Sequence, residues 1–117
     1  MQEKLTFRTI KECCELFNME DKYRPQRAWF RIKNDVCLWC PNLDNDKNWK
    51  NEENANEIIE TNTNENYDNE ARNCDEIRIT FEKRKSTGYC YSGLYKIAKE
   101  KTKNYPSNKR VWERIDI

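Results

Sequence analysis

Residues 77–97 decide the fold and read IRITFEKRKSTGYCYSGLYKI. The first part alternates apolar and polar residues, which is the pattern of a β-strand, because successive side chains of a strand point to opposite faces. The apolar side chains are expected to pack in the core, so Arg78 and Thr80, which alternate with them, are expected to face outward. A turn follows over residues 83–88, and residues 89–97 predict a second strand rich in tyrosine. The stretch therefore predicts a β-hairpin.

Gly93 lies inside the second of these strands. A glycine at that place offers no side chain to pack, which predicts a β-bulge or a close backbone approach. Further along the chain, residues 110–117 alternate again and predict another strand. The C-terminal third is therefore expected to be mainly sheet.

The N-terminal part adds a helix and a second hairpin. Residues 9–18 predict the helix, because Thr9 suits an N-cap and Glu12 follows three positions later. Its apolar residues recur at helical spacing, at Ile10, Cys13, Cys14 and Phe17. Residues 28–32 and 36–40 are rich in residues that favour strands and are separated by turn-forming residues, which predicts the hairpin.

Together these elements predict an α+β fold, with one N-terminal helix packed on a curved, mostly antiparallel sheet or partial barrel. The 117 residues suit one domain over 1–117. Its core must be small, because only 36% of the residues are hydrophobic and 37% are charged. No apolar run approaches the ~20 residues that span a bilayer, and the N-terminus has no apolar signal region. We therefore expect a cytoplasmic protein of a bacterial cell, with no membrane partner.

Charge is nearly balanced over the whole chain but sharply divided along it. Residues 1–41 carry a net charge of +2, residues 42–76 carry −8 and residues 77–117 carry +7. The acidic stretch also holds 11 of the 15 asparagines. Asn and Asp favour turns because their side chains bond to the nearby backbone. We therefore expect residues 42–76 to be an acidic, loop-like insertion.

Three interpretations of this charge division remain open. In the first, the acidic stretch folds over the basic one and neutralises it within the molecule. In the second, the acidic stretch imitates nucleic-acid phosphate and occupies a basic channel of a partner. In the third, the basic block itself binds phosphate. Geometry decides among them, because such fields reach only about 8–10 Å at physiological salt.

The chain contains no histidine, which removes most enzyme chemistry. Without imidazole there is no Ser-His-Asp or Cys-His pair, and no zinc site that mixes cysteine with histidine. Two glycines are also too few for a phosphate-binding loop. We therefore expect a protein that is not an enzyme and has no catalytic residues, cofactor or metal.

The six cysteines do not clearly indicate a metal site or a disulfide. Cys37 and Cys40 have the two-residue spacing of a zinc or redox pair, but no second pair shares that spacing. Cys13 and Cys14 point about 100° apart on a helix, which is awkward for chelating one ion. Buried free thiols are the favoured interpretation, and a metal site or a disulfide at Cys37 and Cys40 stays open.

Cations and aromatic residues alternate in the C-terminal third. Nucleic-acid surfaces use this combination because cations meet phosphates while rings stack on exposed bases. The alternative is that the rings fill a thin core while the lysines keep the domain soluble. The candidate residues for binding a partner or nucleic acid are Lys83, Arg84, Lys85, Tyr91, Tyr95, Lys96, Arg110, Trp112 and Arg114.

Several short segments also form a recognisable pattern. They are Arg78-Ile79-Thr80-Phe81, Tyr89-Cys90-Tyr91-Ser92-Gly93-Leu94-Tyr95-Lys96-Ile97, Arg110-Val111-Trp112-Glu113-Arg114-Ile115, and upstream Trp49-Lys50-Asn51 and Ile58-Ile59-Glu60. The pattern resembles small β-rich domains appended to bacterial HNH endonucleases and restriction-type proteins. This resemblance implies a recognition module of restriction and defence systems, here without a nuclease module.

Two main functions are compatible with these observations, and a third is less favoured. As a short chain without chemistry, the protein looks like the small anti-CRISPR-like inhibitors that phages use against bacterial immunity. It would then bind a bacterial immune effector protein or ribonucleoprotein and block it sterically. This is the first expectation. The alternative is a nucleic-acid-binding reader domain of restriction-type systems, for modified or single-stranded DNA, with DNA or RNA as the partner. A carboxylate-dependent hydrolase is the third and least favoured option.

Overall fold

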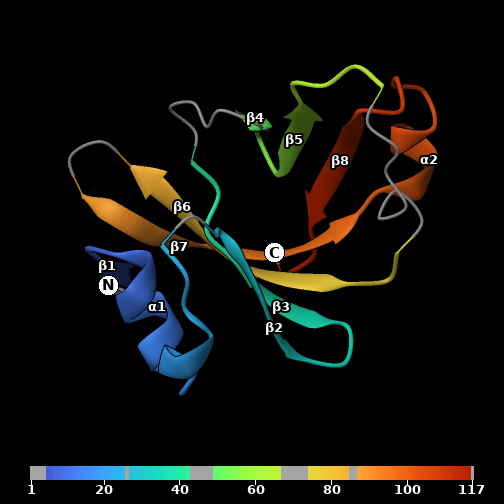
Figure 1. Ribbon diagram of the computed structural model, residues 1–117. Helices are drawn as coiled ribbons and strands as arrows, with labels where there is room; N and C mark the ends of the chain where they lie inside the picture. The colour runs from blue at the N-terminus through green and yellow to red at the C-terminus, as the bar shows by residue number, and fades with distance from the viewer. Residues whose placement is uncertain (1–4, 26, 43–48, 67–73, 85–86, 117) are drawn as a thin grey trace.

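The hairpin of β6 (Ile77–Arg84) and β7 (Gly88–Ile97) lies at the centre of the sheet in the computed structural model (Figure 1). The structure describes residues 5–25, 27–42, 49–66, 74–84 and 87–116. The other strands are β1 (Thr6–Phe7), β2 (Trp29–Lys33), β3 (Val36–Trp39), β4 (Trp49–Asn54), β5 (Glu57–Asn62) and β8 (Lys109–Arg114). The helical segments are α1 (Ile10–Leu16), a short 3-10 helix (Glu20–Lys22) and α2 (Lys99–Thr102).

The eight described strands form one mixed sheet in the order β2-β3-β6-β7-β8-β5-β4, with β1 added beside β7. The neighbouring strands pair antiparallel, apart from β3 and β6, which run parallel. The sheet is strongly curved. Strands four places apart in a flat sheet would be separated by roughly 19 Å, yet Arg84 of β6 reaches Glu53 of β4 with a hydrogen bond of 3.1 Å.

The predicted α+β class is wrong, because the described chain is mostly β. The longest helix, α1, has seven residues, and α2 has four. The two helices lie at opposite ends of the sheet (Figure 1), so neither forms a layer over it. The predicted helix itself is present, and Glu12 donates its backbone N–H to the Thr9 side chain at 3.1 Å, which confirms the N-cap.

The acidic stretch also differs from the expectation of a loop. Between residues 49 and 62 it forms the β4–β5 hairpin, and β5 pairs with β8 of the basic block. The strand pattern is hidden in the sequence because polar residues, Asn51, Glu60 and Asn62, occupy several inward positions where apolar residues would be expected. The turn of this hairpin contains Ala55, whose φ is +42°.

Two other predictions for the strands are confirmed. The hairpin of β2 and β3 turns at Asp35, which has a φ of +55°. A bulge also interrupts β7, because Thr80 pairs with Gly93 while the next residue of β6 pairs with Tyr91. Gly93 has a φ of +131°, and an added Cβ would lie 2.3 Å from Arg114 Nε. The close approach at Gly93 therefore comes from a side chain.

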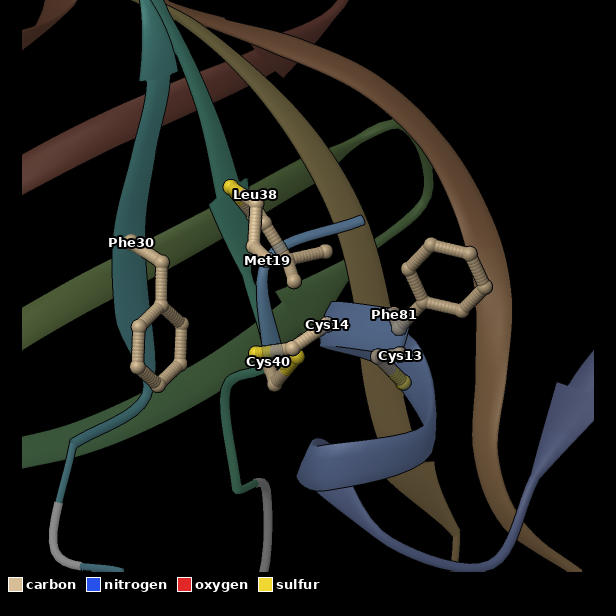
Figure 2. Packing of buried hydrophobic residues seen from close by; sticks show 7 residues of the cluster. All are labelled: Cys13, Cys14, Met19, Phe30, Leu38, Cys40 and Phe81. Atoms are coloured by element: carbon tan, nitrogen blue, oxygen red, sulfur yellow. The ribbon is translucent and has the colours of Figure 1, made fainter. Parts of the chain in front are cut away.

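The outer face of the sheet carries the larger of two apolar clusters. Cys13 and Cys14 of α1 pack with Phe30, Leu38 and Phe81 from three strands. Figure 2 shows these side chains meeting where α1 crosses the sheet. All six cysteines are free, and four of them, Cys13, Cys14, Cys37 and Cys40, are buried, as the sequence predicts for those four. A second cluster of buried residues, Trp39, Ile58, Tyr95, Ile97 and Trp112, lies on the inner face beside the polar groups.

Candidate nucleic-acid interface

The concave inner face of the sheet carries aromatic and charged side chains instead of a purely apolar layer. Strand register brings them together from β3, β5, β6, β7 and β8, with β4 at the edge. Its main members are Trp39, Trp49, Asn51, Glu60, Arg78, Glu82, Tyr95, Arg110 and Trp112. The expectation that Arg78 and Thr80 face outward is therefore wrong. Their side chains point inward, with residue exposures of 5% and 0%.

Arg78 lies at the centre of this face, against two tryptophans. Its guanidinium carbon is 3.9 Å from the ring centroid of Trp112 and 4.7 Å from that of Trp39. The same guanidinium donates to Glu76 at 2.8 Å and lies 3.6 Å from Glu60. Cation–π contacts and ion pairs are both strengthened where water is excluded, so Arg78 holds these rings in fixed positions.

Arg110 repeats this arrangement nearer to β4. Its guanidinium carbon lies 4.8 Å from the ring centroid of Trp49, and its Nε is 2.9 Å from Glu60 Oε1. Glu60 also accepts a hydrogen bond of 3.0 Å from Trp112 Nε1. One carboxylate therefore connects both arginines and an indole, which makes the cluster a single charged and aromatic network.

Glu76 forms the other end of the network. It accepts hydrogen bonds from Trp29 Nε1 at 3.1 Å and from Arg78. Burial would raise the pKa of Glu76, but the charge of Arg78 and the hydrogen bonds from Arg78, Cys37 and Trp29 hold it below its ordinary value. Burial, helped by Glu76, raises the pKa of the Cys37 thiol to about 12. Cys37 is therefore a neutral thiol at neutral pH.

Two groups on the inner face differ from this network, because they have no hydrogen-bond partner. Asn51 Oδ1 and both carboxyl oxygens of Glu82 are buried and accept no hydrogen bond in the described structure. The amide nitrogen of Asn51 is held by the Asn42 carbonyl at 3.3 Å, which fixes the side chain. Buried polar groups are normally hydrogen-bonded, so these atoms are candidates for contacting a ligand.

The predicted binding residues are divided between the two faces. Tyr95, Arg110 and Trp112 meet on the inner face, and Arg84 lies at its edge. Lys83, Lys96 and Tyr91 point to the other face, where Tyr91 packs on Phe81 with ring centroids 5.5 Å apart. Arg114 Nε is paired with Asp116 at 2.7 Å. Lys85 lies outside the described residues.

Sequence reasoning missed the polar members of the inner face, Asn51, Glu60 and Glu82, as candidates. Their positions follow from strand alternation once β4 and β5 are known. The signal in the sequence was the pair of segments around Trp49-Lys50-Asn51 and Ile58-Ile59-Glu60. The Asn-rich, acidic composition of these segments instead predicts a loop.

The acidic and basic stretches are joined by ion pairs. Glu60 pairs with Arg110 and Glu53 with Arg84, while Lys101 is bound by Glu57 of the acidic stretch. Asp75 and Lys99 add a further pair at 2.9 Å, which lowers the pKa of Asp75. The interpretation that the two stretches neutralise each other within the molecule is confirmed for these pairs.

Over the described ranges, no group of three or more Cys, Asp or Glu side chains could hold a metal ion. No helix in those ranges is long and apolar enough to cross a lipid bilayer. The candidate binding surface is the inner face of the sheet, with the residues given above.

The fold and this face define a small β-sheet binding domain. The model of the SRA family, described as the SET and RING associated domain, matches residues 1–117. The chain therefore belongs to the SRA family. It is a DNA-binding reader domain of the kind found in restriction-type systems.

A solved structure supports this assignment. The chain is similar to the 5-hydroxymethylcytosine-specific restriction enzyme AbaSI, with 26% sequence identity and a TM-score of 0.73. The match covers 96% of this chain and 38% of that enzyme. No curated protein sequence matches the chain. Of the two functions expected from the sequence, the reader is supported, whereas the phage inhibitor and its immune-effector partner receive no support.

Proposed function

We propose that this domain recognises a modified cytosine in DNA, with the base turned out of the duplex and held against the inner face of the sheet. The observation that carries the proposal is a set of buried oxygens that accept no hydrogen bond, Asn51 Oδ1 and the Glu82 carboxyl oxygens, of which Oε2 lies 3.0 Å from Arg84 Nη2. A cytosine with a hydroxymethyl group offers an amino group and a hydroxyl, and both can donate to such acceptors. The similarity to AbaSI supports this class of ligand.

The position of these atoms supports a base that has left the duplex. They lie on the concave side of a curved sheet, and a base that is still paired inside a helix cannot reach them. Trp49 lies on the same face of β4 as Asn51, two positions away, with a half-buried ring. Stacking of a base on an aromatic ring contributes about 1–3 kcal/mol. Trp49 therefore suits stacking, and Asn51 suits hydrogen bonding.

The first experiment compares three duplexes that differ at one central cytosine, which is unmodified, 5-methylated or 5-hydroxymethylated. We expect the dissociation constant, measured by fluorescence anisotropy at one fixed salt concentration, to be lowest for a modified duplex by about tenfold or more. A mismatch opposite the modified base should lower it further, because less pairing energy is lost when the base turns out. Equal affinity for the three duplexes would contradict the proposal.

Asn51→Ala tests the site itself. Losing one hydrogen bond to the base should reduce the preference for the modified duplex by roughly fivefold or more, equivalent to about 1 kcal/mol. Asn54→Ala is the matched control, because Asn54 is an exposed asparagine on the opposite face of the same strand. The same loss in both variants would show that Asn51 does not contact the base.

A further inference from the structure

The central strand β6 turns its apolar side chains away from the inner face. Ile77 and Ile79 lie on the outer face and are half-buried, whereas their neighbours Arg78 and Thr80 are 5% and 0% exposed on the inner face. β6 is paired on both edges, by β3 and β7, so its isoleucines are exposed through the outer face of the sheet. Apolar side chains in the middle of a sheet normally pack against a second layer. The outer face around β6 therefore has the character of a surface that binds another layer.

Strand register extends this apolar surface across the sheet. Leu94 of β7 lies opposite Ile79, and the backbone N–H of Ile115 bonds to the Leu94 carbonyl at 2.8 Å. Ile115 is 47% exposed and Tyr91 is 37% exposed. We call this surface the outer patch, and its half-buried or exposed members are Val36, Ile77, Ile79, Tyr91, Leu94 and Ile115.

The two helices lie beside the outer patch. α1 packs on the outer face around Phe81. α2 packs beside β8, where the Thr102 hydroxyl accepts a hydrogen bond of 3.0 Å from the Val111 N–H. The helices are at opposite ends of the sheet (Figure 1). With strands about 4.8 Å apart and residues about 3.3 Å apart along a strand, the patch and its borders measure roughly 25 by 20 Å.

The borders of the outer patch differ in charge. The β2 border has a surplus of positive charge, from Arg31 and Lys33 against Asp35. The border at β8 and β5 has a surplus of negative charge, because Glu57 and Glu113 share Lys101. A second copy, turned about a two-fold axis parallel to β6, would bring the positive border of each copy against the negative border of the other. DNA suits this surface poorly, because its phosphates would meet an apolar centre and a negative border.

We propose that the outer patch is the interface of a symmetric dimer of this chain. The two copies pack back to back, with their apolar centres in contact and their inner faces turned away from each other. The buried area would total about 1,000 Å², which is at the lower end for specific interfaces. We therefore expect a reversible dimer with a dissociation constant of roughly 10–100 μM. This inference does not depend on what the inner face binds.

The first experiment is sedimentation equilibrium of the chain at concentrations from about 5 to 500 μM, a range that spans the expected dissociation constant. The average mass should rise from 14.3 kDa towards twice that value and stop there. Amide chemical shifts measured by NMR at the lowest and highest concentrations locate the interface. The shifts should change mainly in β3, β6, β7 and the end of β8.

Ile115→Lys tests the patch itself. It places a cation in the apolar centre of the interface, so the dissociation constant of the dimer should increase at least tenfold. Ile115 is already 47% exposed in the single chain, so the variant should fold. Leu16→Lys is the matched control, because Leu16 is 46% exposed on α1, outside the patch. Its dissociation constant should stay unchanged, and urea unfolding curves check that both variants are folded.

Four results would overturn the proposal. A mass of 14.3 kDa at every concentration would leave the outer patch to a different protein. A mass that keeps rising beyond the dimer would indicate non-specific association. Equal effects of Ile115→Lys and Leu16→Lys would place the interface elsewhere. Dissociation of the dimer by a 5-hydroxymethylcytosine duplex would make DNA the occupant of the patch, whereas a dimer that persists with the duplex bound would support back-to-back packing.

Discussion

Arg78 is the residue on which the inner face depends most. It touches Trp39 and Trp112 and neutralises two buried carboxylates, Glu60 and Glu76. A buried ion pair adds little stability compared with an apolar pair of the same shape, but removing only one partner leaves an uncompensated charge. Arg78 is therefore best regarded as the counter-charge that allows this polar face to exist.

Arg78→Ala should lower the free energy of unfolding by about 3–5 kcal/mol, because Glu76 loses its buried counter-charge and Glu60 keeps only that of Arg110. Urea denaturation followed by tryptophan fluorescence measures the change. Lys103→Ala removes a cation from an exposed pair with Glu100 and should change stability by about 0.5 kcal/mol or less. A similar small effect in both variants would show that the Arg78 pairs contribute little.

At the scale of elements, the bulge in β7 links strand geometry to the end of the chain. Gly93 has a φ of +131°, a conformation that other residues rarely adopt, and the Arg114 and Asp116 side chains fill the space where a Cβ would lie. Because Arg114 and Asp116 bind each other there, a side chain at position 93 would separate them. The bulge therefore fixes both the register of β7 and the position of this ion pair.

Gly93→Ala should destabilise the domain by about 1–3 kcal/mol, through the strained backbone and the displaced ion pair. The shift of the urea midpoint at constant m-value measures this effect. Lys96→Ala on the same strand is the control, since its Cβ is already accommodated and its side chain points to the other face. Equal midpoints for Gly93→Ala and the unsubstituted chain would contradict the structural role of the bulge.

How far the elements could be predicted depended on which residues point inward. The strands around Ile79, Leu38 and Val111 were found, because apolar alternation is the signal that such analysis uses. The β4–β5 hairpin was missed, because Asn51 and Glu60 occupy inward positions where that signal needs apolar residues. Of the site, Tyr95, Arg110 and Trp112 were among the predicted residues, whereas Asn51 and Glu60 were missed for the same reason as the hairpin.

The prediction of the fold class was wrong for a different reason. The spacing around Cys13 predicts a helix correctly, but it says nothing of how much of the sheet seven residues can cover. Strand order could not be predicted from local sequence patterns either, because the parallel pairing of Leu38 with Ile79 joins segments about 40 residues apart. Local periodicity gave the elements, and tertiary contacts decided the class.

At the scale of the whole molecule, many of the charged side chains form ion pairs within the fold. The acidic β4–β5 hairpin is tied to the basic block through Arg84, Lys101 and Arg110. The absence of histidine predicted a binding protein, and the family assignment agrees with that prediction. The charge pattern alone could not separate a reader from an inhibitor, because a basic surface suits DNA and an acidic protein equally.

The same division of charge predicts which cations respond to salt when DNA binds. Lys101 is held by Glu57 and Glu113, so a phosphate would have to displace two carboxylates to reach it. Lys83, on the outer face near the β6–β7 turn, has no ion pair among the described residues. If it contacts a phosphate, Lys83→Ala should reduce the slope of log affinity against log salt by about 0.9, equally for modified and unmodified duplexes.

Lys101→Ala is the control and should leave that slope unchanged. Anisotropy titrations from about 50 to 300 mM salt measure both slopes, and this range is wide enough to resolve the loss of one phosphate contact. An unchanged slope for Lys83→Ala would place the DNA backbone away from this turn, and a change confined to Lys101→Ala would show that binding breaks the ion pairs of the free domain.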